Sequence, residues 1–359
     1  MAKIDAFFKL VNEQGASDLH LISGQQPILR LYGELERVKY KVLENDELKA
    51  MLYEIAPEHK IKIFEETGDV DFGYEIPGVA RYRANFFNQK NGCAAVFRQI
   101  PTKVLTAQDL GLPPILTRAA MLPKGLILVT GPTGSGKSTT MAAMIDHANK
   151  HRKDHIITIE DPIEFVHQSQ GCVINHREVG THTRSFAAAL RGALREDPDI
   201  ILVGEMRDLE TIRLAVEAAE TGHLVVATLH TTSAAKSVDR IIEVFPHDEQ
   251  AQIRSTLSTS LKVVVAQTLF KRIDRRGLCA ALEIMVCTPA IANLIRENKI
   301  FQIPSAIQVG RKFGMQTLDD AIMELLNKKW INPAEAYNKC IDKGKFLPFL
   351  KTPPDDLAG

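Results

Sequence analysis

The sequence predicts a two-part α/β protein, in which a larger domain built on a parallel sheet follows a smaller α+β domain. Four short runs in the second part consist almost wholly of aliphatic or β-branched residues: 126–130, 156–159, 200–203 and 224–228. Strands of this kind are buried on both faces, which requires a parallel sheet covered by helices. A glycine-rich stretch at 131–138 directly follows the first run. The length of 359 residues also suits two domains.

The first hundred residues mix helical and strand patterns. The elements that we expect there are a helix at 4–11, a strand at 19–22, a hairpin within 25–38, two helices within 44–67, and strands at 70–74, 79–87 and 94–99. Three prolines, Pro101, Pro113 and Pro114, then interrupt all periodicity. We therefore place an N-terminal domain at 1–100, a linker at 101–114 and the larger domain at 115–359, with a helical region beyond Pro289.

Composition excludes several classes of protein. The 44 basic and 44 acidic residues cancel, so no net charge favours nucleic acid as a partner. The five cysteines are scattered and form no C-x-x-C pair, which argues against a disulfide framework and against a structural zinc site. The N-terminus has no signal-peptide pattern, and no apolar run approaches the ~20 residues of a transmembrane helix. We expect a cytoplasmic protein without a transmembrane segment.

The stretch after the first aliphatic run matches the phosphate-binding pattern G-x-x-x-x-G-K-[ST], between a predicted strand and a predicted helix. Its glycines let several backbone N–H groups point at phosphate oxygens, and the following helix adds its positive end. Lys137 would bind the β- and γ-phosphates of ATP, and the Ser138 hydroxyl would bind Mg²⁺. The predicted nucleotide-binding residues are Gly131, Pro132, Thr133, Gly134, Ser135, Gly136, Lys137, Ser138 and Thr139.

Two acidic residues stand just past predicted strands. Glu160 follows the run 156–159, and Glu205 follows the run 200–203 after a single glycine. The carboxyl ends of strands in an open α/β sheet face the ligand crevice, so both acids should point towards the phosphates. Either glutamate could position the attacking water as a general base. Glu205 would also help Ser138 to hold Mg²⁺, a role that Glu160 or Asp161 could share.

Histidines and arginines supply further candidates. His223 and His230 bracket the run 224–228, and their spacing is wrong for a zinc pair on one helix face. Either histidine could be structural, although His230, at a strand's carboxyl end, could contact the γ-phosphate. In the N-terminal domain, Arg81, Arg83 and Arg98 lie on predicted strands. They could be a solvated strand face, or arginine fingers that reach a neighbouring subunit's nucleotide.

Taken together, the motifs resemble those of the secretion ATPase superfamily, which drives type IV pili and type II secretion. Residues 157–164 resemble its Asp box, residues 194–208 its Walker B segment, and residues 221–231 its His box. All three follow the phosphate loop in the family's order and spacing. This resemblance covers essentially the whole chain and is more specific than any single motif.

Within that superfamily the chain is most similar to the PilT-type retraction ATPases of type IV pili. Residues 15–20 resemble the start of their PAS-like N-terminal domain, and residues 310–317 are also similar. Residues 290–297 resemble the retraction signature AIRNLIRE, with Ala292 in place of its first arginine. The four-cysteine insertion of the assembly ATPases has no counterpart here, which weakens an assembly role.

The resemblance implies a PAS-like domain followed by a RecA-like P-loop ATPase domain, in a homohexamer with ATP at its interfaces. It implies that Glu160 is the catalytic glutamate, that Glu205 is the Walker B acid and that His223 and His230 form the His box. Arg81, Arg83 and Arg98 occupy the region of the family's phosphate-contacting arginines. The motor would be peripheral at the inner membrane, where a platform protein passes its force to pilin.

Other functions stay open on the sequence. Inside the superfamily, the chain could be an accessory PilU-like ATPase or an assembly-type ATPase. Outside it, the same kind of core could serve a nucleic-acid translocase, but the zero net charge argues against that function. It could also serve a small-molecule kinase, but a kinase would not need the about 110 residues that precede the core.

Overall fold

The structure is a computed structural model that describes residues 4–31, 34–77, 79–100 and 104–350. It divides into two units, which are described separately below. The first comprises the residues up to Val104 together with Asp161–Val166, and the second comprises Leu105–Glu160 and the residues from His167 onward. Part of the expected linker, at 101–103, lies outside the described residues.

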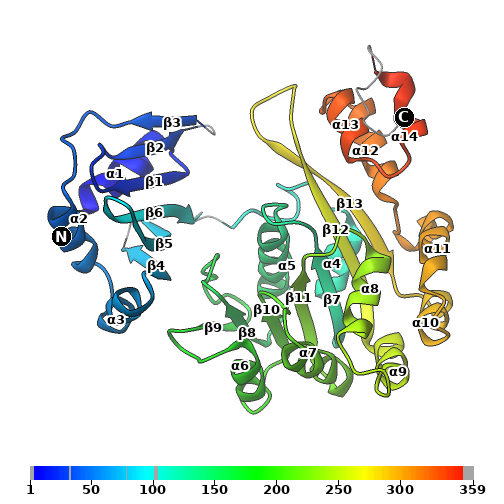
Figure 1. Cartoon of the computed structure of the whole chain (residues 1–359). Helices are drawn as coiled ribbons and strands as arrows, with labels where there is room; N and C mark the ends of the chain where they lie inside the picture. Colours follow the sequence, from blue (N-terminus) through cyan, green and yellow to red (C-terminus); the bar gives the residue numbers. More distant parts are fainter. Residues whose placement is uncertain (1–3, 32–33, 78, 101–103, 351–359) are drawn as a thin grey trace. The chain divides into compact units, whose positions relative to one another are not determined.

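A six-stranded antiparallel sheet forms the first unit in its described part, with the order β3-β2-β1-β6-β5-β4 (Figure 1). The strands are β1 (Asp18–Ile22), β2 (Ile28–Leu31), β3 (Glu34–Arg37), β4 (Asp69–Ile76), β5 (Ala80–Gln89) and β6 (Gly92–Ile100). The helices are α1 (Asp5–Gln14), α2 (Asn45–Tyr53) and α3 (Glu58–Thr67). These elements match the expected ones in kind and order.

Aromatic side chains join α1 of this unit to its sheet. Phe8 is fully buried and lies 4.4 Å from the Tyr82 ring and 4.9 Å from the Phe97 ring, between centroids. The Tyr82 hydroxyl donates a hydrogen bond to the Phe8 carbonyl at 3.0 Å. Burial raises the pKa of Tyr82 to about 12. The first unit therefore has a hydrophobic core of its own.

A seven-stranded sheet organises the described part of the second unit, in the order β13-β12-β7-β11-β10-β8-β9. Its strands are β7 (Gly125–Thr130), β8 (His155–Glu160), β9 (Val173–Glu178), β10 (Ile200–Val203), β11 (Leu224–Leu229), β12 (Leu261–Lys271) and β13 (Leu278–Val286). All neighbouring pairs are parallel except β12 and β13. The four predicted aliphatic runs are β7, β8, β10 and β11, and they are fully or almost fully buried.

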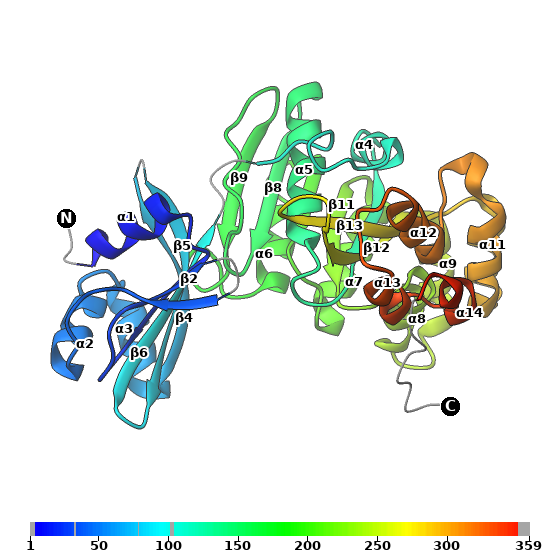
Figure 2. The same cartoon turned by 90° about the horizontal axis from the view of Figure 1, so that it is seen from above.

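Helices cover both faces of this sheet (Figures 1 and 2). The described helices of this unit are α4 (Pro114–Ala120), α5 (Lys137–His151), α6 (Phe186–Ala193), α7 (Leu209–Thr221), α8 (Ala234–Glu243), α9 (Gln250–Ser260), α10 (Pro289–Arg296), α11 (Ile303–Val309), α12 (Leu318–Asn327), α13 (Pro333–Lys339) and α14 (Lys343–Phe346). Asp208 caps α7 by accepting a hydrogen bond from the Thr211 N–H at 2.8 Å. None of the helices in the described ranges is both long and apolar enough to cross a membrane.

Three strands of the second unit were not among the predicted ones. β9 alternates between buried and exposed residues, and it lies at the edge of the sheet. β12 begins directly where α9 ends, without a glycine or proline to mark the change. β13 returns beside β12 as an antiparallel edge strand. The predicted parallel core is therefore extended at both edges by strands that only tertiary pairing defines.

The parallel register places four strand ends along one edge of the sheet. Thr130 at the end of β7 pairs with Leu229 at the end of β11. Val203 of β10 pairs with Ala227 of β11 on one side and with Ile159 of β8 on the other. The segments that follow these strands must therefore leave the sheet at the same edge.

We expect Phe8→Ala to lower the free energy of unfolding by about 3–5 kcal/mol, because it empties the centre of the first unit's core. Denaturant titration followed by circular dichroism would measure the loss. Leu35→Ala is the control, since Leu35 is 54% exposed and its truncation should change stability by no more than about 0.5 kcal/mol. A loss at Phe8 no larger than that at Leu35 would contradict the packing described above.

Candidate functional site

The glycine-rich loop connects β7 to α5, as the motif predicts. Gly134 and Gly136 have φ values of 77° and 84°, which side chains rarely tolerate. At Gly131 a Cβ atom would lie 2.4 Å from the Gln267 carbonyl oxygen. The loop thus requires glycine for two reasons, a left-handed backbone and a close approach to β12.

The open end of the loop carries positive charge. Lys137 begins the 15-residue helix α5, whose unpaired N–H groups add partial positive charge. Its Nζ donates to the carbonyl oxygens of Gly131 at 2.9 Å and Pro132 at 3.0 Å. Ser138 and Thr139 lie half-buried in the first turn of the same helix. An anion held by the loop would therefore meet the ammonium group and the helix end together.

The interior of the loop fits a phosphate cradle. A Cβ atom on Gly131 would also come within 2.6 Å of the Ser135 hydroxyl oxygen, so a larger residue would fill the curl of the chain. The buried Ser135 hydroxyl has no hydrogen-bond partner among the described residues. Glycines at tight contacts, a lysine and a helix N-terminus are the features with which proteins bind nucleotide phosphates.

Glu205 lies in a cluster of charges just past β10. Its Oε1 accepts hydrogen bonds from Arg207 Nε and from His230 Nε2, the latter at 2.7 Å. Burial alone would raise the pKa of the Glu205 carboxyl, but the Arg207 hydrogen bond and the charges of His230 and Arg207 outweigh it. The net effect lowers the pKa of Glu205 below its ordinary value, so the group is a carboxylate at neutral pH.

Glu160 is the last residue of β8 and is 9% exposed. The Gly204 N–H donates to the Ile159 carbonyl at 2.8 Å, and a Cβ on Gly204 would lie 3.3 Å from Glu160 Cα. The residue before Glu205 therefore packs directly on the backbone of Glu160. The structure brings the two predicted acids to neighbouring strand ends, as the sequence predicts.

The two histidines lie at opposite ends of β11. His230 follows the carboxyl end of the strand, on the edge that carries the phosphate loop, and reaches Glu205. His223 precedes the strand, its Nδ1 lies 3.0 Å from the Ala218 carbonyl oxygen, and its own carbonyl accepts from Gly125. Six strand residues separate the two rings, about 20 Å of chain. Of the two histidines, only His230 therefore lies at the edge of the sheet that carries the phosphate loop.

The three arginines lie on one face of the first unit's sheet. Arg83 and Arg98 are directly opposite each other on β5 and β6, and Arg81 is two residues from Arg83. Each has an acidic partner: Arg81 pairs with Glu75 at 3.4 Å, Arg83 Nε with Asp71 at 2.8 Å, and Arg98 with Asp18 at 2.9 Å. The Asp71 hydrogen bond raises the pKa of Arg83. The Arg98 side chain is 70% exposed and is the most accessible of the three.

Sequence reasoning missed Gln267 as a residue of the phosphate loop's surroundings. This side chain of β12 is 4% exposed, and it forms hydrogen bonds with the Ser135 carbonyl and the Thr140 hydroxyl. The sequence signal is the polar pair Gln267 and Thr268 inside the otherwise apolar run 263–270. That signal becomes meaningful only when the strand is known to lie beside β7.

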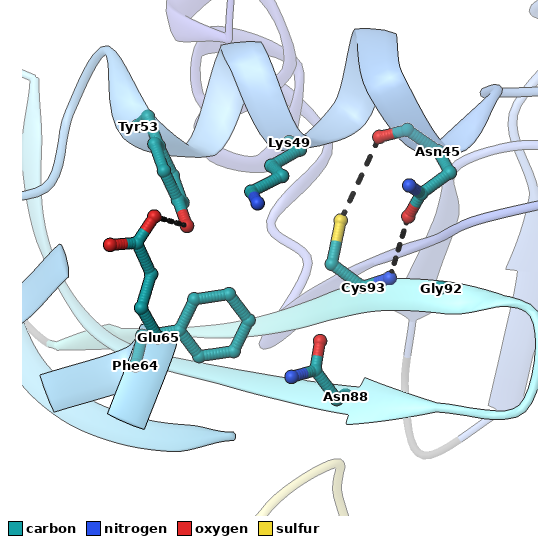
Figure 3. A pocket seen from close by; sticks show the side chains of 8 residues that line it. All are labelled: Asn45, Lys49, Tyr53, Phe64, Glu65, Asn88, Gly92 and Cys93. Carbon is teal, nitrogen blue, oxygen red and sulfur yellow. Dashed lines mark hydrogen bonds between the residues drawn. The ribbon is translucent and has the colours of Figure 1, made fainter. Parts of the chain in front are cut away.

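A hollow of about 250 Å³ lies in the first unit, between α2, α3 and the β5–β6 hairpin (Figure 3). Its lining residues are Asn45, Lys49, Tyr53, Phe64, Glu65, Asn88, Gly92 and Cys93. The Tyr53 hydroxyl donates to Glu65 at 3.1 Å, and the Cys93 N–H donates to Asn45 at 2.9 Å. None of these residues was predicted to bind nucleotide.

Comparison with known proteins shows the protein family to which the chain belongs. Residues 3–298 match the family described as "Type II/IV secretion system protein", and the chain belongs to that family. Members of the family are ATPases, and so is this chain. The fold is the mixed α/β fold with a parallel sheet found in these ATPases.

Individual relatives identify the branch of the family. The chain is 57% identical to the "Type IV pilus retractation ATPase PilT" of Pseudomonas aeruginosa, over 91% of this chain and 95% of the relative. It is 53% identical to the "Twitching motility protein" of Neisseria gonorrhoeae, over 86% and 83% of the two chains. The crystal structure of "the Pilus Retraction Motor PilT and Bound ADP" superposes with a TM-score of 0.89 at 42% identity, over 96% of this chain and 98% of that one.

We expect Glu205→Gln to slow ATP hydrolysis at least about hundredfold while nucleotide stays bound, because the amide removes the negative charge that would help to hold Mg²⁺ and that faces His230 and Arg207. Phosphate release and ADP binding by calorimetry would measure the two effects. Glu210→Gln is the matched control, since Glu210 also pairs with an arginine, Arg191, but on the exposed surface. Hydrolysis at the wild-type rate in Glu205→Gln would remove Glu205 from the site.

Proposed function

We propose that the chain hydrolyses ATP to drive type IV pilus retraction, by pulling pilin subunits out of the fibre. The observation that carries the proposal is 57% identity over nearly the full length of both chains to a retraction ATPase. A loop that fits a phosphate, followed at the same sheet edge by two acids and a histidine, supports the chemistry.

The proposed nucleotide site runs from Gly131 to Thr139. Its backbone N–H groups would hold the phosphates, and Lys137 would move from the loop carbonyls to the β- and γ-phosphates. Mg²⁺, held by the Ser138 hydroxyl and by Glu205, would neutralise phosphate charge. In the described part of the chain no three His, Cys, Asp or Glu side chains are grouped to hold a metal ion, so phosphate oxygens would have to complete its shell.

The proposed hydrolytic groups are Glu160 and Glu205, with His230 beside them. Glu160 would orient the attacking water and accept its proton. His230 donates to Glu205, so a γ-phosphate that engages His230 would change the environment of that carboxylate directly. Occupancy of the nucleotide site would thus be signalled to the end of β10.

The proposed architecture is a PAS-like N-terminal domain at 1–100, a linker at 101–114 and a RecA-like ATPase domain at 115–359. The two units of the structure support a division near this point. The chain also crosses between units at both ends of Asp161–Val166, immediately after Glu160. A change at Glu160 would therefore be passed along the backbone into the segment that groups with the N-terminal unit.

We further propose a homohexamer in which Arg81, Arg83 and Arg98 act as arginine fingers on a neighbouring subunit's nucleotide. Their common face on the sheet and the exposure of Arg98 support this role. During the ATPase cycle the arginines would have to leave their acidic partners and bind phosphate oxygens instead. Such an exchange would couple nucleotide binding to movement of the N-terminal domain.

The proposed partners are an inner-membrane platform protein and, through it, pilin, with the hexamer peripheral to that membrane on the cytoplasmic side. The retraction signature forms α10, whose Ile291 and Ile295 are buried while Asn293 and Arg296 are exposed. α10 packs on α9 through the buried residues, and its exposed side is available to a partner.

Deletion of the gene tests the function. We expect abundant surface pili without twitching motility, because pili would still be assembled but not withdrawn. Electron-microscopic pilus counts and a motility assay would measure both effects. Complementation should succeed with the wild type and fail with Lys137→Ala, which removes the phosphate-binding charge.

Loss of surface pili on deletion would instead favour an assembly ATPase. Wild-type pili and motility would favour an accessory ATPase whose work another motor performs. Stimulation of the purified ATPase by single-stranded DNA would favour a nucleic-acid translocase.

A further inference from the structure

We propose that Gln267 is a positioning residue for ATP binding. Its side chain orients the phosphate loop from the buried side of the loop. The inference rests on the proposed phosphate site at Gly131–Thr139. Gln267 lies on β12, one residue past Ala266, whose register partner is Thr130 at the end of β7. Its side chain therefore begins beside the first residue of the loop.

The strand's alternation directs this side chain towards α5. Val263 and Val265 lie on the same face of β12 as Gln267, and both belong to the core cluster that contains Met141 and Met144 of α5. Gln267 is the next residue of this row and is almost fully buried. A polar amide in such a place is stable only if both of its ends are hydrogen-bonded.

Both ends of the amide are indeed satisfied by the loop and its helix. Nε2 donates to the Ser135 carbonyl oxygen at 2.6 Å, and Oε1 accepts from the Thr140 hydroxyl at 2.7 Å. The Ser135 carbonyl can only accept, so it fixes which end of the amide carries the donor, and the Thr140 hydroxyl donates to the other end. Gln267 thus joins the curl of the loop to the first turn of α5.

The bond to Ser135 sets the direction of the next N–H group. The Ser135 carbonyl and the Gly136 N–H belong to one planar trans peptide, so they point in opposite directions. Because Gln267 holds the Ser135 carbonyl towards the protein interior, the Gly136 N–H points away from the interior, to the side where a phosphate would bind. A Cβ on Gly136 would lie 2.8 Å from Gln267 Nε2. This close contact favours glycine at the position, in addition to its positive φ.

Gln267→Glu is the sharpest test, because a carboxylate keeps the size and the bond from Thr140 but cannot donate to the Ser135 carbonyl. We expect the affinity for Mg²⁺-ADP, measured by calorimetry on the full chain at about pH 8, to fall about tenfold or more. The KM for ATP should rise in parallel. Thr140→Val, which leaves the donor to Ser135 in place, should lower the affinity less.

Acidification should rescue this variant selectively. A protonated carboxyl group has the donor and the acceptor of the original amide, and burial makes such protonation easier by raising the carboxyl pKa. We therefore expect Gln267→Glu to recover much of its ADP affinity between about pH 8 and about pH 6, relative to the wild type. Because acid would also relieve a carboxylate that merely destabilised the fold, the recovery is measured only at pH values where the variant is folded.

Gln316→Glu is the matched control. Gln316 also donates its Nε2 to a backbone carbonyl, that of Leu282 at 2.7 Å, but on the antiparallel edge strand β13. We expect this variant to keep wild-type ADP affinity at both pH values. Thermal unfolding of each variant without nucleotide would show whether it is folded.

Lys137→Ala separates the two hypotheses. If it leaves ADP affinity unchanged, the proposed phosphate site is wrong, whatever Gln267 does. If Lys137→Ala loses affinity while a folded Gln267→Glu binds ADP like the wild type at about pH 8, only the positioning role is overturned. Weak binding by Gln267→Glu at both pH values alike would also overturn it.

Discussion

The parallel register of β7, β11, β10 and β8 is the constraint on which the candidate site depends. It brings four strand ends to one edge of the sheet, so that segments separated by up to a hundred residues leave the core side by side. The buried aliphatic strands supply the rigidity, and the loop at Gly131 and the carboxylate of Glu205 carry the chemistry. A shift of one strand by one residue would turn its side chains to the opposite face of the sheet and would separate Glu205 from His230.

The site is also held from inside the protein. Glu205 is fixed by Arg207 and His230, and Gly204 allows β10 to lie against the backbone of Glu160. Gln267 plays a comparable part beneath the phosphate loop. Residues that hold the binding groups in place reduce the reorganisation that nucleotide binding requires. Their hydrogen bonds therefore matter to the site as much as the groups that touch the ligand.

Elements with strong local patterns were predictable. The four aliphatic strands, the helix from Leu209 with its Asp208 cap and the glycine loop all follow from the properties of adjacent residues. β12 and β13 were not predicted although both are largely apolar, and the place of β12 beside β7 depends on pairing with a strand far away in the chain. The position of His230 after the run 224–228 already distinguished it from His223, and the direction of β11 places it at the loop's edge.

The sequence by itself determined the phosphate-binding motif, the nature of its partner acids and the membership of an ATPase family, because these depend on residue types at short, fixed spacings. Only the tertiary structure decided that Glu205 meets His230 and Arg207, that three arginines share one face, and that Gln267 lies under the loop. These contacts join residues from different strands and helices. Their geometry comes from sheet order and packing, which no local spacing encodes.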